Sequence, residues 1–132
     1  MKIIDKLAWI EIQNKSILST RSKGKNKYYI PGGKREEGES DKQALMREIK
    51  EELSVDLKEE SIKFLGIFEG QAHGHAEGII VKMQCYMSDF KGNLKPAAEI
   101  EEMIWLNFKD IEKVSPVDKI IFKWLKEKDL IN

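Results

Sequence analysis

The segment from residue 40 to residue 55 constrains the fold most, because it combines a marked helix start with two neighbouring helix faces of opposite character. Ser40 and Gln43 have the spacing of a capping box, and Asp41 suits the positive end of the helix dipole, so we expect a helix that begins at Asp41. Its apolar side chains fall on one arc, namely Leu45, Met46, Ile49 and Leu53. This arc is expected to pack against the rest of the chain.

Three glutamates, Glu48, Glu51 and Glu52, occupy the arc beside the apolar one, at positions i, i+3 and i+4. Like charges at this spacing destabilise an isolated helix by about a few tenths of a kcal/mol each, so the cluster does not serve helix stability. A hard divalent cation would remove the repulsion, and carboxylate oxygens suit Mg²⁺ or Mn²⁺. The neighbouring Arg47 either orients one of these carboxylates or forms an ordinary surface ion pair with Glu51.

A glycine-containing turn at residues 31–33 precedes this segment, and its two glycines allow backbone angles that other residues rarely adopt. A short strand at residues 28–30 is expected to lead into the turn. The basic stretch at residues 21–27 is either a solvated hairpin tip or a phosphate contact.

The remaining elements follow from apolar periodicity. Residues 7–12 and 16–20 flank the turn-like pair Asn14-Lys15 and predict an antiparallel hairpin. Residues 63–70 and 79–87 predict two strands that pair with each other, and residues 103–107 predict a last strand. Ser115 and Pro116 begin a final amphipathic helix, which is expected to lie on the sheet.

Two histidines lie in the loop between the paired strands. His73 and His75 have i, i+2 spacing near Glu69 and Glu77, which could hold a transition metal. Alternatively, the loop is a turn with polar tips, or it overhangs the glutamate helix and its histidines contact substrate.

Length and charge narrow the class of protein. The chain has 132 residues, so we expect one domain over residues 1–132. Its 23 basic residues balance 23 acidic ones, so bulk charge gives no reason to expect a nucleic-acid polymer or a membrane as partner. The single cysteine, Cys85, suits a reducing compartment, and no apolar run has the length of a signal peptide core or a membrane span. We therefore expect a soluble cytoplasmic protein.

The segment from Gly33 to Val55 reads G-x5-E-x7-R-E-I-K-E-E-L-S-V. This pattern resembles the Nudix box, the signature of the Nudix (MutT-type) hydrolases, which reads G-x5-E-x7-R-E-U-x-E-E-x-G-U with U an aliphatic residue. Every charged position matches. The one departure is Ser54, where the family has glycine. A residue other than glycine costs on the order of 1 kcal/mol in the left-handed conformation that commonly ends a helix.

The resemblance implies an α/β Nudix fold, with a mixed β-sheet sandwiched between helices. It also implies Mg²⁺- or Mn²⁺-dependent hydrolysis of a diphosphate bond. Carried over position by position, Glu48 and Glu52 are the principal metal ligands, and Glu51 supports them directly or through water. The Gly33 carbonyl completes the ligand set, and Arg47 and Glu39 orient the ligands.

A general base in this family often comes from the loop before the late strand, which here spans residues 99–102. Glu99 is the first candidate and Glu102 the second, although both would equally serve as solvated loop charges. The residues expected to act in catalysis are thus Arg47, Glu51, Glu99 and Glu102.

The substrate is expected to be a small nucleotide, and most simply a nucleoside triphosphate that yields a monophosphate and pyrophosphate. This choice rests on the absence of the subfamily marks for other substrates. The alternatives are ADP-ribose or another sugar nucleotide, and a nucleotide-sensing domain without catalysis. Candidate substrate contacts are Tyr28 or Tyr29, Phe68, His73 and Asp118. Asp118 equally suits the first turn of the last helix, and homodimerisation, common among relatives, stays open.

Overall fold

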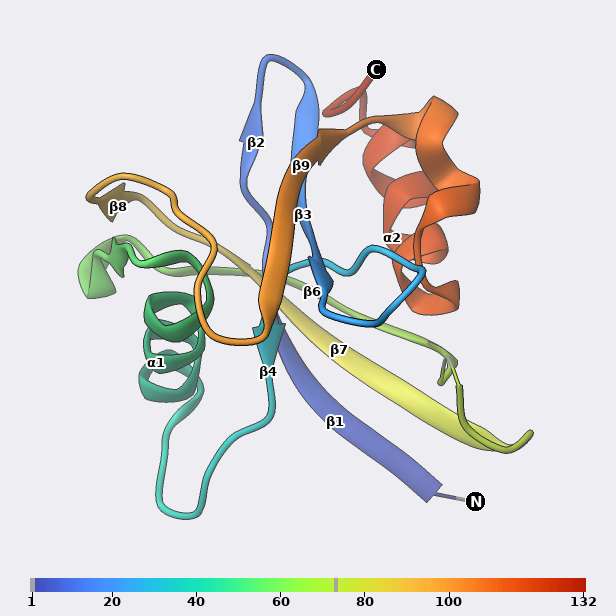
Figure 1. Cartoon of the computed structure of the whole chain (residues 1–132), viewed down its shortest axis with the longest axis horizontal. Coiled ribbons are helices and arrows are strands. Elements are labelled where there is room, and N and C mark those ends of the chain that lie inside the picture. The colour runs from blue at the N-terminus through green and yellow to red at the C-terminus, as the bar shows by residue number, and fades with distance from the viewer. Residues whose placement is uncertain (1, 73) are drawn as a thin grey trace.

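The computed structural model describes residues 2–72 and 74–132, and its centre is a four-stranded mixed sheet (Figure 1). The strand order is β4-β1-β7-β6. β1 and β7 run parallel, with Lys6 opposite Met83, whereas β1 with β4 and β6 with β7 are antiparallel. The bounds are β1 Lys2–Trp9, β4 Gly32–Gly33, β6 Lys63–Gln71 and β7 Ile79–Met87.

Two smaller sheets complete the strands. The three-stranded sheet has the order β2-β3-β9, with β2 at Ile12–Gln13, β3 at Ser16–Ser22 and β9 at Ile100–Leu106. A two-stranded ribbon pairs β5 (Asp56–Leu57) with β8 (Phe90–Lys91).

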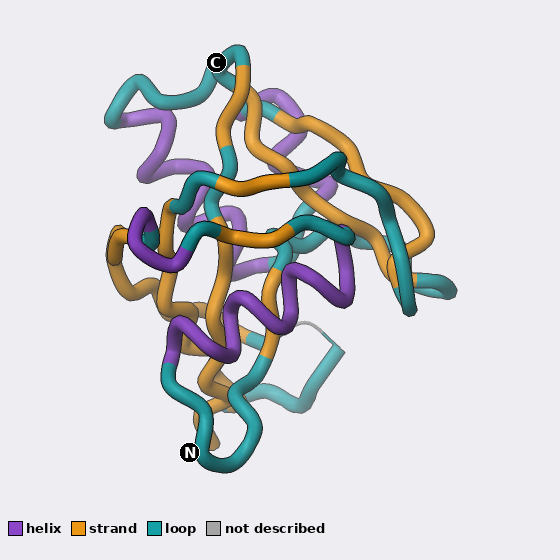
Figure 2. The backbone as a smooth tube through the Cα atoms, turned by 90° about the vertical axis from the view of Figure 1, so that its left-hand side faces the viewer, coloured by secondary structure: helices purple, strands orange, loops and turns teal. Residues whose placement is uncertain are grey.

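Helices lie on both sides of these strands. They are α1 at Asp41–Leu53 and α2 at Pro116–Glu127, with short 3₁₀ helices η1 at Glu59–Ser61 and η2 at Phe108–Lys113. α1 and α2 flank the strands from opposite sides in Figure 1, and Figure 2 looks onto α1 with the strands behind it. The expected mixed sheet between helices is therefore confirmed.

Alternation along β1 divides the core in two. Leu7 and Trp9 pack with the buried face of α1, whereas Ile4 and Ala8 pack on the other face with α2. Because successive strand residues point to opposite faces, one central strand serves both apolar clusters.

The predicted start of α1 is confirmed. Ser40 Oγ accepts a hydrogen bond from the Gln43 backbone N–H at 3.2 Å, and Gln43 Oε1 accepts one from the Ser40 N–H at 2.9 Å. The helix ends at Leu53, and its C-cap residue Ser54 has a left-handed φ of 67°, as the family glycine at this position led us to expect.

Three expectations about strands were wrong in part. The hairpin around Asn14-Lys15 is real but joins the short β2 to β3, because β1 ends at Trp9 and pairs with β4 and β7 instead. Residues 28–30 form only isolated bridges, through Tyr28 and Tyr29. β9 begins at Ile100, so Glu102 belongs to a strand and not to the preceding loop.

Candidate active site

Two glycines bring β4 close to both β1 and α1. A Cβ atom at Gly32, where φ is +150°, would overlap the Leu7 carbonyl oxygen. A Cβ atom at Gly33 would lie 2.5 Å from the carboxyl carbon of Glu48. Real Cβ atoms do not approach backbone so closely, so glycine is required at position 32, whereas a side chain at position 33 would displace the Glu48 carboxylate that lies against the Gly33 backbone.

Arg47 ties together the charged residues at the start and the middle of α1. Its Nε and Nη2 donate to the two carboxylate oxygens of Glu39, at 2.7 and 2.9 Å, and its Nη1 donates to Glu48 at 2.8 Å. The same Nη1 lies 3.5 Å from Glu51 Oε1. The bidentate contact with Arg47, helped by the Glu36 N–H, lowers the pKa of Glu39 to about 2. Arg47 therefore holds Glu48 from one side while Glu39 holds Arg47.

Glu52 is the buried member of the acidic cluster, with 6% of its surface exposed. One of its carboxylate oxygens accepts a hydrogen bond from the Gly32 N–H at 3.2 Å. Burial and the neighbouring Glu48 carboxylate raise the pKa of Glu52 to about 8. Burial also raises the pKa of Glu48, against the opposing effect of Arg47. Burial therefore disfavours the ionised form of both carboxylates, and Arg47 offsets this effect in part at Glu48.

The donor set fits a divalent cation. Glu48 and Glu52 supply hard oxygen ligands in a recess where ionisation is otherwise unfavourable, and Gly33 leaves room for the Glu48 carboxylate. Glu51 is half exposed and contacts Arg47. Within residues 2–72 and 74–132, no three or more His, Cys, Asp or Glu side chains are grouped so that they could hold a metal ion by themselves. Glu48 and Glu52 therefore offer carboxylate oxygens for only part of a cation's ligand set.

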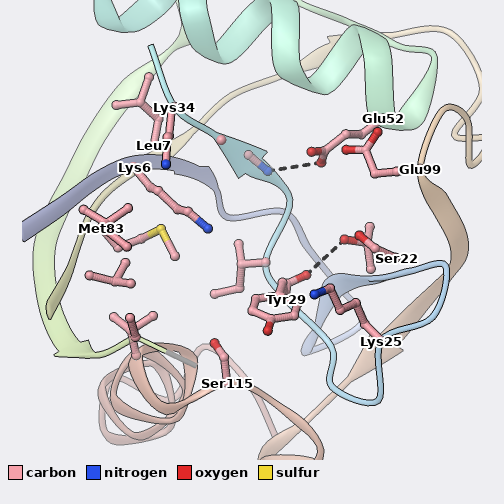
Figure 3. A pocket seen from close by; sticks show the side chains of 18 of the residues that line it. Lys6, Leu7, Ser22, Lys25, Tyr29, Lys34, Glu52, Met83, Glu99 and Ser115 are labelled. Carbon is pink, nitrogen blue, oxygen red and sulfur yellow. Dashed lines mark hydrogen bonds between the residues drawn. The ribbon is translucent and has the colours of Figure 1, made fainter. Parts of the chain in front are cut away.

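A pocket of about 330 Å³ opens beside Glu52 (Figure 3). Glu52 and Glu99 lie side by side at one end, and the Gly32–Gly33 backbone borders them. The cavity extends from there over the central sheet towards the start of α2. Its polar lining there includes Lys6, Thr20, Ser22, Tyr29 and Ser115.

The two candidate bases are separated by the fold. Glu99 lines the pocket, in the loop that precedes β9. Glu102 does not line it, because its Oε1 accepts hydrogen bonds from Arg21 Nε at 3.1 Å and from the Tyr28 hydroxyl at 2.9 Å. Glu99 is the only one of the two that faces Glu52.

Only some of the candidate substrate contacts line the pocket. Tyr29 lines the pocket, whereas Phe68 packs edge-on against Trp124 with ring centroids 5.6 Å apart. Asp118 is fully buried, and its Oδ2 accepts the Ile30 N–H at 2.8 Å. Burial raises the pKa of Asp118 to about 7. His75 lines the pocket, and His73 lies outside the described residues.

Lys6 and Ser115 are among the pocket residues that were not identified as site residues from the sequence. Lys6 lies in β1 between Ile4 and Ala8 on the apolar face, so the interruption of an apolar alternation by lysine was a usable signal. Ser115 was expected only as a helix cap, yet its side chain makes no capping hydrogen bond and instead lines the pocket.

The family model of the NUDIX domain matches residues 7–125. The chain belongs to the Nudix family. It is therefore a Nudix hydrolase, an enzyme that acts on pyrophosphate bonds, generally those of a nucleoside diphosphate that is linked to another group. No helix in the described part of the chain is long and apolar enough to cross a membrane.

Solved structures of other proteins share the fold. The E. coli ORF135 protein is 25% identical with a TM-score of 0.72, over 96% of this chain and 92% of that chain. A putative Nudix hydrolase from Chromobacterium violaceum is 23% identical with a TM-score of 0.73, over 96% and 78%. A MutT protein from Methanosarcina mazei Go1 is 18% identical with a TM-score of 0.76, over 97% and 96%. No curated protein sequence matches significantly.

Proposed function

We propose that this Nudix hydrolase cleaves a nucleoside triphosphate into a nucleoside monophosphate and pyrophosphate, with Mg²⁺ or Mn²⁺ held by Glu48 and Glu52. The observation that carries the proposal is the pair of glutamates beside the Gly32–Gly33 backbone, Glu48 and Glu52, of which Glu52 lines a pocket that also contains Glu99. A substrate diphosphate would be repelled by this carboxylate pair in the absence of a cation.

Each residue of the site has a separate task in this proposal. A bound divalent cation would neutralise the diphosphate charge and make the attacking water more acidic. Glu99 accepts the proton of that water, because its carboxylate lines the pocket next to Glu52. Arg47 fixes the Glu48 carboxylate from outside the pocket, and Glu39 fixes Arg47. Glu51, which contacts Arg47, is the remaining acidic group able to assist.

A panel of nucleoside triphosphates, ADP-ribose and sugar nucleotides, assayed for product release with Mg²⁺ and with Mn²⁺, tests the proposal. We expect the triphosphates to be the best substrates and pyrophosphate to be their second product. Greater turnover of ADP-ribose or a sugar nucleotide would replace the triphosphate assignment. Tight nucleotide binding without turnover of any compound would favour a sensor over an enzyme of this substrate class.

Matched variants test the roles of the residues. Glu99→Gln is expected to lower kcat by at least about tenfold at saturating Mg²⁺, the usual order for loss of a general base. Glu102→Gln is expected to change kcat by less than about threefold, because its partners Arg21 and Tyr28 lie outside the pocket lining. Equal effects of the two substitutions would refute Glu99 as the base.

A further inference from the structure

Lys6 occupies a position where the fold alone would favour an apolar residue. It lies in the middle of β1, opposite Met83 of β7, and shares a sheet face with Ile4 and Ala8. Both of these neighbours and Met83 are buried parts of the apolar cluster that packs on α2. A lysine in such a row costs desolvation energy that valine or isoleucine would avoid. The sequence therefore retains a charged group at some expense to the core.

The Lys6 ammonium has no partner within the described protein. Neither a hydrogen bond nor an ion pair joins its Nζ to any residue in 2–72 or 74–132. Burial lowers the pKa of Lys6, and the nearby Asp118 carboxylate opposes this effect. Figure 3 shows the side chain extending into the pocket, so the ammonium faces the space that a ligand would fill.

A second unsatisfied group lines the same part of the pocket. Ser115 is 2% exposed, and its Oγ acts on the neighbouring Asp118 carboxylate, lowering the pKa of Asp118, without forming a hydrogen bond of normal geometry to any described residue. Both Ser115 and Lys6 line the cavity, together with apolar side chains that include Ile30, Met83 and Val117. A buried hydroxyl and a desolvated ammonium in an apolar chamber are groups whose hydrogen bonds a ligand completes.

The walls around Lys6 favour a neutral acceptor over a second phosphate. Charges of both signs already act on the Lys6 ammonium, namely the carboxylates of Asp118, Glu52 and Glu48 and the ammonium of Lys34. The apolar walls of the chamber suit a flat heterocycle that carries a hydrogen-bond acceptor better than a hydrated phosphate. A carbonyl oxygen of a nucleobase meets both conditions, since lysine is a donor without acceptor capacity.

We propose that Lys6 is a specificity-determining residue that donates a hydrogen bond to the keto oxygen of the substrate's base, at C6 of a purine or C4 of a pyrimidine. This inference rests on the proposed triphosphate function. It makes guanine and uracil or thymine nucleotides the preferred class. Adenine and cytosine present an amino group at the corresponding position, which cannot accept from an ammonium. The Ser115 hydroxyl, which can donate or accept, contacts the same end of the base.

The test compares Lys6→Met with the wild-type protein in direct binding of GMP, UMP, AMP and CMP, and in kcat/KM for the four triphosphates. Lys82→Met is the matched control, because Lys82 precedes Met83 in β7 and points to the opposite sheet face. Wild-type protein is expected to bind GMP and UMP more tightly than AMP and CMP. Lys6→Met is expected to weaken binding of the keto nucleotides GMP and UMP by at least about tenfold. It is expected to weaken binding of the amino nucleotides AMP and CMP by less than about twofold.

Several outcomes would overturn the assignment. An equal loss of affinity for all four nucleotides would indicate that Lys6 contacts the phosphates. No loss of affinity would show that Lys6 takes no part in substrate recognition. Wild-type protein that binds the four equally, or binds none, also contradicts it. Thermal unfolding of Lys6→Met is expected at or above the wild-type temperature, which separates lost recognition from lost folding. Because binding is measured without turnover, an absence of triphosphate hydrolysis would refute the proposed function and still leave the base preference tested.

Discussion

Replacement of Glu52 by glutamine is expected to stabilise the metal-free protein at alkaline pH and to leave its stability nearly unchanged at pH 5. Glutamine has the same shape, and its Oε1 can still accept the Gly32 N–H. The difference between the two proteins is the carboxylate charge, which lies almost entirely out of solvent. The substitution therefore isolates the free-energy cost of ionising Glu52 in the folded state.

The magnitude follows from the pKa of Glu52, which folding raises from 4.5 to about 8. Because the folded pKa is higher, the folded state holds the Glu52 proton more tightly than the unfolded state does. This proton therefore stabilises the folded state, and the stabilisation is complete only at a pH below the unfolded pKa. The effect is lost as the pH rises from the unfolded pKa through the folded one. At about 1.4 kcal/mol per unit, the wild-type protein should lose about 4 kcal/mol relative to Glu52→Gln between pH 5 and pH 9.

Urea denaturation followed by tryptophan fluorescence measures this difference, since Trp9 is fully buried. The two proteins are compared at pH 5, 7 and 9 in EDTA, with Glu60→Gln as control because Glu60 is exposed. Saturating Mg²⁺ is then expected to stabilise the wild-type protein at pH 9 and to have little effect on Glu52→Gln. Parallel stability curves for the two proteins across this pH range would refute the reasoning.

Two further substitutions test the same site, and a third tests the end of α1. Gly33→Ala should lower kcat/KM by at least about tenfold, because the alanine Cβ displaces the Glu48 carboxylate. A circular dichroism spectrum like that of the wild-type protein is the control that the variant is folded. Arg47→Gln should lower kcat by about 10- to 100-fold with Mg²⁺ saturating, as expected when a group that orients a metal ligand is lost; an unchanged kcat would show that Glu48 needs no such support. Ser54→Gly should raise the free energy of unfolding by at most about 1 kcal/mol and keep activity, since it relieves a φ of 67° but loses the Ser54 hydrogen bond to the Lys95 carbonyl; thermal denaturation that shows a large loss would contradict this.

Local chemistry made α1 predictable. The capping box, the acidic first turn and the apolar arc all act within one or two helical turns, so the start at Asp41 and the buried Leu45 could be derived from the sequence. The left-handed end at Ser54 followed from the position of the family glycine. By contrast, the partners of β1 lie far along the chain, at residues 32–33 and 79–86, and apolar alternation carries no information about them.

The acidic cluster was predictable for the same local reason, whereas the walls of the pocket were not. Spacing along α1 placed Glu48 and Glu52 on one arc, but only the fold shows that Glu52 is buried and that Glu99 reaches it. The sequence ranks Glu99 above Glu102 as a candidate base but shows no contact that distinguishes them. The ion pair with Arg21, formed across β3 and β9, is what separates them.

A Mn²⁺ titration in two buffers of different ionisation enthalpy tests most directly whether Glu48 and Glu52 hold the cation. With its pKa raised to about 8, Glu52 is largely protonated at pH 7 in the metal-free protein. Mn²⁺ binding to the wild-type protein should therefore release about one proton. Glu52→Gln should release none and bind Mn²⁺ at least about tenfold more weakly. Unchanged affinity and proton release in Glu52→Gln would contradict the metal site proposed for this Nudix hydrolase.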